Sequence, residues 1–324
     1  MKKMLLFCCL FLWSCQSAPT ESEPGTWQVV REPSEDVYYS SLHFADRNNG
    51  WAVGDSGTII HTDNGGNTWE YQQSGTQNDL RDVHFIDRQT GWAAGADNTL
   101  LRTDDGGQSW QLLTVSGDTA GFFFAIYFAD EQTGWAVSRG RVLRTLDGGT
   151  TWEAQASWER GGSAMICFVN SQVGYVRPAI DTLLYKTTDG GQQWSTLPMK
   201  SLRWETDLYF VDSQHGWVCN TKAPSSSWPD YANVFGTIDG GITWTCLDTL
   251  KEVRHLSAIF FVDDQLGWVA SPDKIYQTTD GGNTWACQFS PEDVFLGFQD
   301  IFFVDDTYGW ALGFLGGILK YVVP

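Results

Sequence analysis

TTDGGNTW at residues 278–285 is the last of six near-copies of one octapeptide. The other copies are TDNGGNTW (62–69), TDDGGQSW (103–110), TLDGGTTW (145–152), TTDGGQQW (187–194) and TIDGGITW (237–244). The tryptophans that close them recur every 41 to 50 residues. A period of this length is typical of proteins built from structural repeats, so the repeat has to be interpreted before any single residue.

A second pattern, F-x-D-x-x-x-G-W, occurs seven times and alternates with the octapeptide. Its first residues are Phe44, Phe85, Phe128, Phe168, Phe210, Phe261 and Phe303. The aromatic residues that close it are Trp51, Trp92, Trp135, Tyr175, Trp217, Trp268 and Trp310. Only the fourth unit departs, with Asn170 in place of Asp and Tyr175 in place of Trp. The two patterns together divide the chain into seven units.

Each unit predicts four short β-strands. In the second unit we expect them at 80–85, 91–95, 99–103 and 110–115, where apolar residues alternate and turn residues separate the runs. Four strands in about 42 residues, repeated radially, are typical of a β-propeller blade.

The two chain ends explain why seven units share only six octapeptides. The last unit stops after its third strand, within residues 316–324. We expect residues 25–30 (GTWQVV) to supply the missing fourth strand, because Trp27 precedes Trp51 by 24 residues, and each octapeptide tryptophan precedes the closing aromatic residue of the next unit by 23 to 25. Closure of this kind removes exposed sheet edges. The sequence therefore predicts one all-β domain over 25–324, a seven-bladed propeller with four-stranded blades whose last blade is closed by the N-terminal strand.

The octapeptide falls between the third and fourth strands, where it would form a turn. Its third residue can accept hydrogen bonds from turn amides, its glycines allow positive φ, and its tryptophan can bury a large ring between blades. Six copies of a joint are expected in a repeat, whereas six catalytic centres are not, and the D-x-D-x-D-G alternation of a calcium loop is absent. We assign a structural role to Asn64, Asp105, Asp147, Asp189, Asp239, Asp280, Trp69, Trp110, Trp152, Trp194, Trp244 and Trp285.

Residues 25–324 resemble the Asp-box (BNR) repeat propellers. The spacing of GWAxG, GxIxxT and DGGxTW within a unit is most similar to the photosystem II stability and assembly-factor propellers. This resemblance implies an envelope or lumenal protein that binds protein partners, presents an arginine-rich surface and carries out no chemistry. Sialidases and some endoglucanases share the octapeptide, so the octapeptide alone does not decide the function.

The first 24 residues predict export and lipid anchoring. MKKMLLFCCLFLWSC begins with two lysines and continues with a short apolar run and a small residue, as secretory signals do. Because a cysteine follows at once, LWSC resembles a bacterial lipoprotein box, with ordinary secretion as the alternative. We expect a signal peptide at 1–14, a lipidated Cys15 and an acidic tether at 15–24, which would place the protein in the bacterial cell envelope, on the periplasmic or outer-membrane surface, with the lipid as its only membrane attachment.

Charge and cysteine content narrow the possible partners. The formal net charge is −19, and it would be −21 without Lys2 and Lys3. Such an acidic body should be repelled by nucleic acids, so we expect no nucleic-acid partner. Four cysteines remain after the lipidation site, and we expect buried free thiols, although an exported protein could also form disulfides: Cys167, Cys219, Cys246 and Cys287.

No catalytic, metal or cofactor motif stands out. His43 and His84 fall in one inner-strand column with Tyr127, Cys167, Tyr209, Phe260 and Phe302, and a column that accepts phenylalanine is a packing column. A sialidase site would need three arginines, a Tyr–Glu pair and a further acid. The F-R-I-P stretch of that family is missing, with VRPAI (176–180) the nearest approach, and sialidases have six blades. We expect a monomeric, non-enzymatic module without cofactor or metal; the alternative is a sialidase- or endoglucanase-like enzyme or a glycan-binding propeller.

One face of the predicted propeller collects arginines and aromatic residues. It carries the turns between second and third strands and the connections between blades, including an insertion within 221–234. Exposed Arg and Trp side chains on loops are typical of binding hot spots. We expect this face to bind an envelope or membrane protein, or an anionic or glycan ligand, through Arg139, Arg141, Arg160, Arg177, Arg203, Arg254, Trp158, Trp204, Trp228 and Tyr231.

Overall fold

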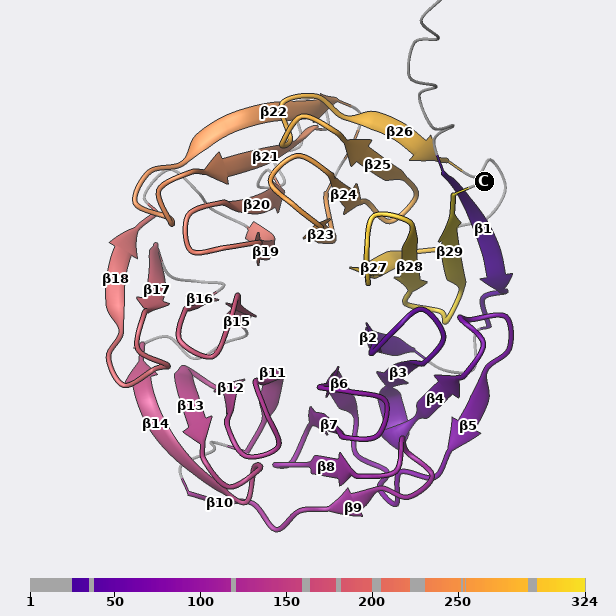
Figure 1. The fold of residues 1–324 in the computed structure, drawn as a ribbon, viewed down its shortest axis with the longest axis vertical. Helices are drawn as coiled ribbons and strands as arrows, with labels where there is room; N and C mark the ends of the chain where they lie inside the picture. The colour runs from indigo at the N-terminus through magenta and orange to yellow at the C-terminus, as the bar shows by residue number, and fades with distance from the viewer. Residues whose placement is uncertain are drawn as a thin grey trace, which may run out of the picture.

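A computed structural model describes the chain at residues 25–34, 38–117, 121–158, 164–178, 182–199, 205–221, 231–251, 253, 255–290 and 296–323. Seven antiparallel sheets are arranged as blades around a central axis (Figure 1). The first strand of each blade lies nearest the axis and the fourth forms the rim. The predicted all-β, seven-bladed propeller is confirmed.

The first four blades follow one another along the chain. Blade 1 contains β2 (Tyr39–Phe44), β3 (Gly50–Gly54), β4 (Ile59–Thr62) and β5 (Glu70–Gln72), and blade 2 contains β6 (Leu80–Phe85), β7 (Gly91–Gly95), β8 (Leu100–Thr103) and β9 (Gln111–Leu112). Blade 3 contains β11 (Phe123–Phe128), β12 (Gly134–Ser138), β13 (Arg141–Thr145) and β14 (Thr151–Ser157), and blade 4 contains β15 (Ala164–Phe168), β16 (Gly174–Pro178), β17 (Leu183–Thr187) and β18 (Ser195–Pro198).

The last three blades complete the ring. Blade 5 contains β19 (Glu205–Phe210), β20 (Gly216–Thr221), β21 (Tyr231–Thr237) and β22 (Thr245–Lys251), and blade 6 contains β23 (Ala258–Phe261), β24 (Gly267–Ala270), β25 (Ile275–Thr278) and β26 (Ala286–Phe289). Blade 7 contains β27 (Phe298–Phe303), β28 (Tyr308–Gly313) and β29 (Ile318–Val322), with β1 (Thr26–Arg31) as its fourth strand. β1 pairs antiparallel with β29 and sets Trp27 opposite Tyr321, so the predicted closure by the N-terminal strand is confirmed.

Three details depart from the simple repeat. The fourth strand of blade 2 is only β9, shorter than the predicted 110–115, because only Gln111 and Leu112 pair in register with β8. A short strand, β10 (Ser116–Gly117), adds a parallel partner to β14. One 3-10 turn, η1 (Asp55–Gly57), follows β3. No helix among the described residues is long and apolar enough to cross a membrane.

Aromatic rings from the two sequence patterns form the core between adjacent blades. Trp51 of blade 1 stacks on Phe85 of blade 2, with ring centroids 3.5 Å apart, and Trp110 meets the same Phe85 edge-on at 5.8 Å. An edge-to-face contact, as between Trp110 and Phe85, is a favourable arrangement of aromatic rings. The stacked pair recurs at every junction, as Trp92–Phe128, Trp135–Phe168, Tyr175–Phe210, Trp217–Phe261, Trp268–Phe303 and Trp310–Phe44.

Each octapeptide forms a turn between the third and fourth strands. In blade 2 the Thr103 hydroxyl donates to Asp105 at 2.8 Å and accepts the Gly107 N–H at 2.8 Å, while Asp105 accepts the Ser109 N–H at 2.9 Å. The glycines at 106 and 107 have φ of 73° and 86°, a region that suits residues without a Cβ. The carbonyl of Gly106 accepts the indole N–H of Trp51 from blade 1 at 3.1 Å, so the turn also joins neighbouring blades.

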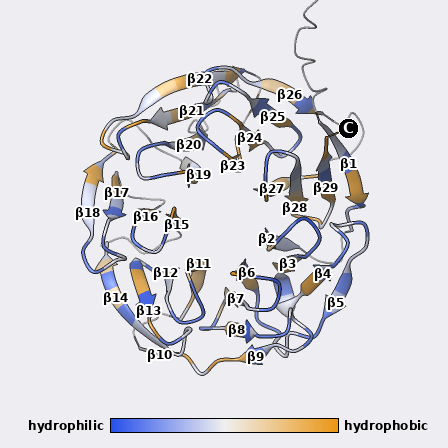
Figure 2. Cartoon of the chain, viewed as in Figure 1, coloured by the Kyte–Doolittle hydropathy of each residue, from blue (hydrophilic) through white to orange (hydrophobic). Residues whose placement is uncertain are grey.

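Hydropathy follows this architecture. Most of the turns that connect the strands are hydrophilic, and most of the hydrophobic residues lie in the strands (Figure 2). The second strands β3, β7, β12 and β16 are buried throughout their length, since each lies between two strands of its own blade and between two neighbouring blades.

Candidate functional site

We call the face with the second-to-third turns and the blade connections the loop face. Half of the predicted partner-binding residues on it lie outside the described residues: Arg160, Arg203, Arg254, Trp204 and Trp228. The anchor residue Cys15 lies outside them as well. Their proposed roles stay predictions.

Three predicted residues are accessible on this face. Arg139 is exposed, and its guanidinium lies 5.9 Å from the centre of the Phe122 ring. Arg141, the first residue of β13, and Tyr231, the first residue of β21, are both partly buried. The structure therefore supports a solvent-facing position for Arg139 above all.

Arg177 and Trp158 are buried, contrary to the prediction that they present their side chains to a partner. Arg177 is only 1% exposed because it lies within β16, a second strand enclosed on all sides, and its guanidinium donates to the carbonyl of Pro178. Trp158 is 9% exposed and packs against Tyr185 with ring centroids 5.8 Å apart. Both residues were expected to be exposed because they stand next to turns in the sequence. Instead, β16 extends over Arg177, and Trp158 folds back onto Tyr185 of the neighbouring blade.

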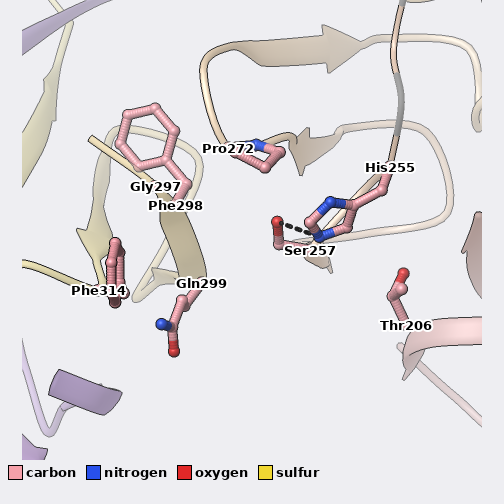
Figure 3. Close-up of a pocket in the computed structure, with 8 residues that line it drawn as sticks. All are labelled: Thr206, His255, Ser257, Pro272, Gly297, Phe298, Gln299 and Phe314. Atoms are coloured by element: carbon pink, nitrogen blue, oxygen red, sulfur yellow. Dashed lines mark hydrogen bonds between the residues drawn. The ribbon is translucent and has the colours of Figure 1, made fainter. Parts of the chain in front are cut away.

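A pocket of about 480 Å³ opens on the loop face where blades 5, 6 and 7 meet (Figure 3). It is lined by Thr206, His255, Ser257, Pro272, Gly297, Phe298, Gln299 and Phe314. His255 and Ser257 lie at its centre, with Nε2 and Oγ 3.3 Å apart, and Phe298, Gln299 and Phe314 form one wall. We call this the mouth pocket; sequence reasoning missed it because its residues come from three blades and share no motif.

The mouth pocket suits binding better than acyl transfer. Burial lowers the pKa of His255, so the imidazole is neutral at neutral pH and could accept a proton from Ser257. An oxyanion would need free donors nearby. The N–H groups of Gly297 and Phe298 both donate to the Pro272 carbonyl, and that of Ser257 donates to Ala270. Neutral polar and aromatic side chains remain to contact a ligand.

A second cavity, about 450 Å³, is the central channel enclosed by the inner strands. The predicted packing column lines it as a belt of rings: His43, His84, Tyr127, Tyr209, Phe260 and Phe302, with Cys167 in the same column. The rings of His43 and His84 are 4.8 Å apart, and burial lowers the pKa of both, that of His84 to about 4. Among the described residues no group of three His, Cys, Asp or Glu side chains could hold a metal ion.

The channel also holds three aspartates that sequence reasoning did not single out. Asp82, Asp207 and Asp300 each stand three residues before the phenylalanine that recurs in every unit, in blades 2, 5 and 7. This column is the signal that could have revealed them. Each carboxylate accepts a backbone N–H from the inner strand of the next blade, donated by Ile126 at 2.7 Å, Ile259 at 2.9 Å and Leu42 at 2.8 Å.

Burial dominates the titration of these aspartates. It raises the pKa of Asp82 to about 6 and those of Asp207 and Asp300 to about 7, although the backbone hydrogen bonds act in the opposite direction. Desolvation disfavours the charged form of a carboxyl group, so near neutral pH the channel holds a mixture of charged and neutral acids.

The four cysteines are free thiols. Cys219 is buried and Cys167 partly so, but Cys246 and Cys287 are exposed, so the expectation of buried thiols is wrong for these two. Both lie on fourth strands, β22 and β26, at the rim of the ring.

Comparison with known proteins agrees with the resemblance to assembly-factor propellers that the repeat indicates. The sequence profile of the photosynthesis system II assembly factor YCF48 family matches residues 19–118 and 71–152. The chain is thus a propeller similar to the photosystem II assembly factors. A solved structure of YCF48 bound to a D1 peptide has a TM-score of 0.76 at 22% identity and covers 92% of this chain and 97% of its own. YCF48 from Cyanidioschyzon merolae has a TM-score of 0.74 at 20% identity, covering 92% of this chain and 98% of its own.

Enzymes share the same architecture. The GH74 xyloglucanase from Xanthomonas campestris has a TM-score of 0.68 at 15% identity and covers 91% of this chain but 53% of its own. Likeness at this level of identity reflects the fold and carries no activity. No curated protein sequence matches the chain significantly.

Proposed function

We propose that the protein is a non-enzymatic, lipid-anchored propeller of the bacterial cell envelope that binds a protein segment through its loop face. The observation that carries this proposal is the similarity to assembly-factor propellers in both repeat sequence and fold, one of which is bound to a peptide. A propeller of this kind acts by presenting a surface formed by loops on a rigid ring.

The loop face offers the groups that such a surface needs. The mouth pocket is open and combines aromatic with neutral polar walls. Tyr38, which is 46% exposed, stacks on Phe314 at 5.1 Å beside this pocket and extends its aromatic surface. Arg139 adds an exposed cation on the same face. Aromatic and Arg side chains are enriched among residues that dominate binding energies.

The proposed anchor rests on the sequence of the first 15 residues alone. A basic start, a short apolar run and LWSC ending at Cys15 support lipidation of that cysteine. The tether that follows would leave the propeller free to reach a partner at the membrane. Metabolic labelling with a fatty acid analogue tests this, since the Cys15→Ser variant should lose the label.

Crosslinking of the full-length protein in its native membrane, followed by capture, tests the binding face. The test variant changes Arg139, Arg160, Arg203 and Arg254 to Ala; Arg177 is kept because it is buried. The matched control is Arg88→Ala, whose side chain is 74% exposed on the opposite face. A discrete partner lost only in the test variant supports the proposal. The same partner in both refutes the arginine surface, and hydrolysis of a glycan panel without any partner would favour the enzyme alternative.

A further inference from the structure

None of the described residues that line the mouth pocket carries a charge at neutral pH. His255 is the one that can titrate, and burial lowers the pKa of its imidazole, which is therefore neutral. Thr206, Ser257 and Gln299 add uncharged polar groups. A charged group on a ligand would find no counter-ion among these residues, and its removal from water would cost free energy. The mouth pocket therefore favours an uncharged ligand.

Two aromatic rings form an apolar platform at the edge of the pocket. Tyr38 is 46% exposed and stacks on Phe314, with the ring planes at 16° and the centroids 5.1 Å apart. Phe314 is partly buried and lies across the pocket from His255, on the same side as Gln299 (Figure 3). The backbone fixes this pair, because the N–H of Tyr39 donates to the carbonyl of Phe314 at 2.9 Å. The platform is thus formed before any ligand binds.

Hydrogen-bonding groups around this platform are unused within the protein. Gln299 is exposed, and neither its side-chain amide nor the hydroxyl of Tyr38 has a hydrogen-bond partner among the described residues. In His255, Nε2 lies 3.3 Å from the hydroxyl of Ser257, while Nδ1 makes no hydrogen bond within the described part of the chain. Amide and phenol groups can both donate hydrogen bonds. The site therefore offers donors to a ligand that carries acceptors.

These features exclude most of the ways in which proteins recognise a peptide. Addition of a strand needs free backbone groups, but the N–H groups of Gly297 and Phe298 already donate to Pro272. The N–H of Phe314 donates to Gly297 at 3.0 Å. An amphipathic helix needs apolar anchors over two turns, whereas the exposed rings here form one stacked pair. A phosphorylated motif needs an arginine cluster, which the described lining residues do not supply. Recognition of a polyproline II segment by aromatic rings remains.

A polyproline II segment matches the groups that the site presents. This conformation has no internal hydrogen bonds, so its carbonyl groups are free to accept them. A proline residue has no N–H, so it brings an acceptor without a donor that the pocket would have to satisfy. Its apolar ring suits an aromatic surface. Because the segment is extended and ordered before it binds, less conformational entropy is lost on binding.

We propose that the mouth pocket binds an uncharged, proline-containing protein segment in the polyproline II conformation. A proline ring packs on the platform of Tyr38 and Phe314, and the Gln299 amide and the Tyr38 hydroxyl donate to the neighbouring carbonyl groups of the segment. The space of about 480 Å³ beside His255 takes the next residue of the segment. This inference rests on the proposed function, because it names the class of segment that the loop face would recognise.

Calorimetric titration of the full-length protein with acetyl-hexaproline amide tests the site. This peptide should bind saturably, and a glycine–serine hexapeptide with the same end groups should bind about ten-fold more weakly or not at all. Tyr38→Ala should weaken binding about ten-fold through loss of the aromatic contact, and Gln299→Ala about two- to ten-fold through loss of a hydrogen bond. Tyr71→Ala, 65% exposed on the rim strand β5, and Gln132→Ala, exposed on the opposite face, are the matched controls and should leave the affinity unchanged.

Several results would overturn the proposal. These are the absence of saturable binding, equal affinity for the two peptides, and equal losses in the test and control variants. A xyloglucan oligosaccharide that binds more tightly than hexaproline and displaces it would assign the pocket to glycans instead.

A measurement on the wild-type protein covers the case in which a variant fails to fold. Diethyl pyrocarbonate modifies neutral imidazole groups, and mass spectrometry locates the modified residues. Saturating hexaproline should slow the modification of His255 severalfold. It should leave that of His215, whose Nδ1 lies 2.8 Å from Asp212 on the opposite face, unchanged. Unaltered modification of His255 in the presence of the peptide overturns the proposal.

Partner capture separates this site from the proposed function. If the wild type captures a partner that Tyr38→Ala captures equally well, the pocket proposal alone fails. If hexaproline binds as expected but the wild type captures no partner, the loop-face function alone fails.

Discussion

Replacing Asp300 with Asn should change the pH dependence of stability in a defined direction. In the folded protein burial raises the pKa of this carboxyl from its usual 3.8 to about 7. The folded state therefore holds a proton over a pH range in which the unfolded chain has released it. Stability that depends on this proton is fully present below the unfolded pKa and falls as the pH rises toward the folded pKa.

The magnitude follows from the same two values. Each pH unit between them is worth about 1.4 kcal/mol, so Asp300 should cost the wild type about 4 kcal/mol relative to the variant between about pH 4 and pH 7. The difference in unfolding free energy, wild type minus Asp300→Asn, should fall across this interval and level off above it. The histidines titrate in both proteins, so their contribution cancels in this difference, which retains that of Asp300 together with its coupling to Asp207 and Asp82.

Urea unfolding followed by tryptophan fluorescence measures the difference at a series of pH values. Asp305→Asn is the matched control from the same blade. Although burial acts in the opposite direction, hydrogen bonds from Thr307 and the ion pair with Arg47 lower the pKa of Asp305. Its contribution is lost only as the pH falls below the usual aspartate range, so its difference curve should be flat between about pH 5 and pH 8. A flat or rising curve for Asp300→Asn would refute the assignment of a buried, protonated carboxyl.

Two further experiments test the strained glycines of the octapeptide turns and the exposure of the rim strands. Gly149→Ala should destabilise the protein by about 1–3 kcal/mol, because its φ is 100° and a Cβ would lie 2.5 Å from a leucine methyl group. Gly75→Ala, with φ of 76° and open space around it, should cost clearly less; equal losses of melting temperature would contradict this. A thiol reagent should label Cys246 and Cys287 in the native protein, and Cys219 only after unfolding. Slow labelling of all three would show that the rim strands are covered.

The fold could be predicted from the sequence because every blade repeats the same local rule. The spacing of Trp110 and Phe85 in one unit fixes the strand order, and six similar units leave few alternatives to a ring. The exact length of rim strands such as β9 could not be predicted. Turn residues show where such a strand starts, but no local pattern shows where its pairing with the third strand ends.

The candidate site was much less visible. Arg177 looked like a loop residue beside a proline, but β16 extends over it and buries it. Exposure depends on how far a strand runs and on what the neighbouring blade covers, neither of which is local. Asp82 and its two counterparts fall in a column that varies between blades, and only the closed ring brings them around one channel.

The junction between blades 6 and 7, where the ring closes, has the aromatic packing of the repeat but not its octapeptide hydrogen bond. We call this junction the seam. At the other junctions, wherever the F-x-D-x-x-x-G-W pattern ends in tryptophan, the indole N–H donates to a glycine carbonyl of the octapeptide turn in the next blade. One example is Trp310, which donates to Gly65 at 3.1 Å. Trp268 faces blade 7, which has no octapeptide, and its indole N–H is buried without a partner among the described residues. An unpaired buried donor costs about 1–3 kcal/mol.

The octapeptide cannot exist at this seam, because it is the turn between a third and a fourth strand, and here these strands come from opposite ends of the chain. The packing half of the repeat survives: Trp27 meets Phe303 edge-on at 5.7 Å, as the octapeptide tryptophans meet their phenylalanines. The Gly25 N–H also donates to the Tyr321 hydroxyl at 3.1 Å. Closure therefore relies on the pairing of β1 with β29 and on this aromatic contact, while the hydrogen bonds of the repeat hold the other blades.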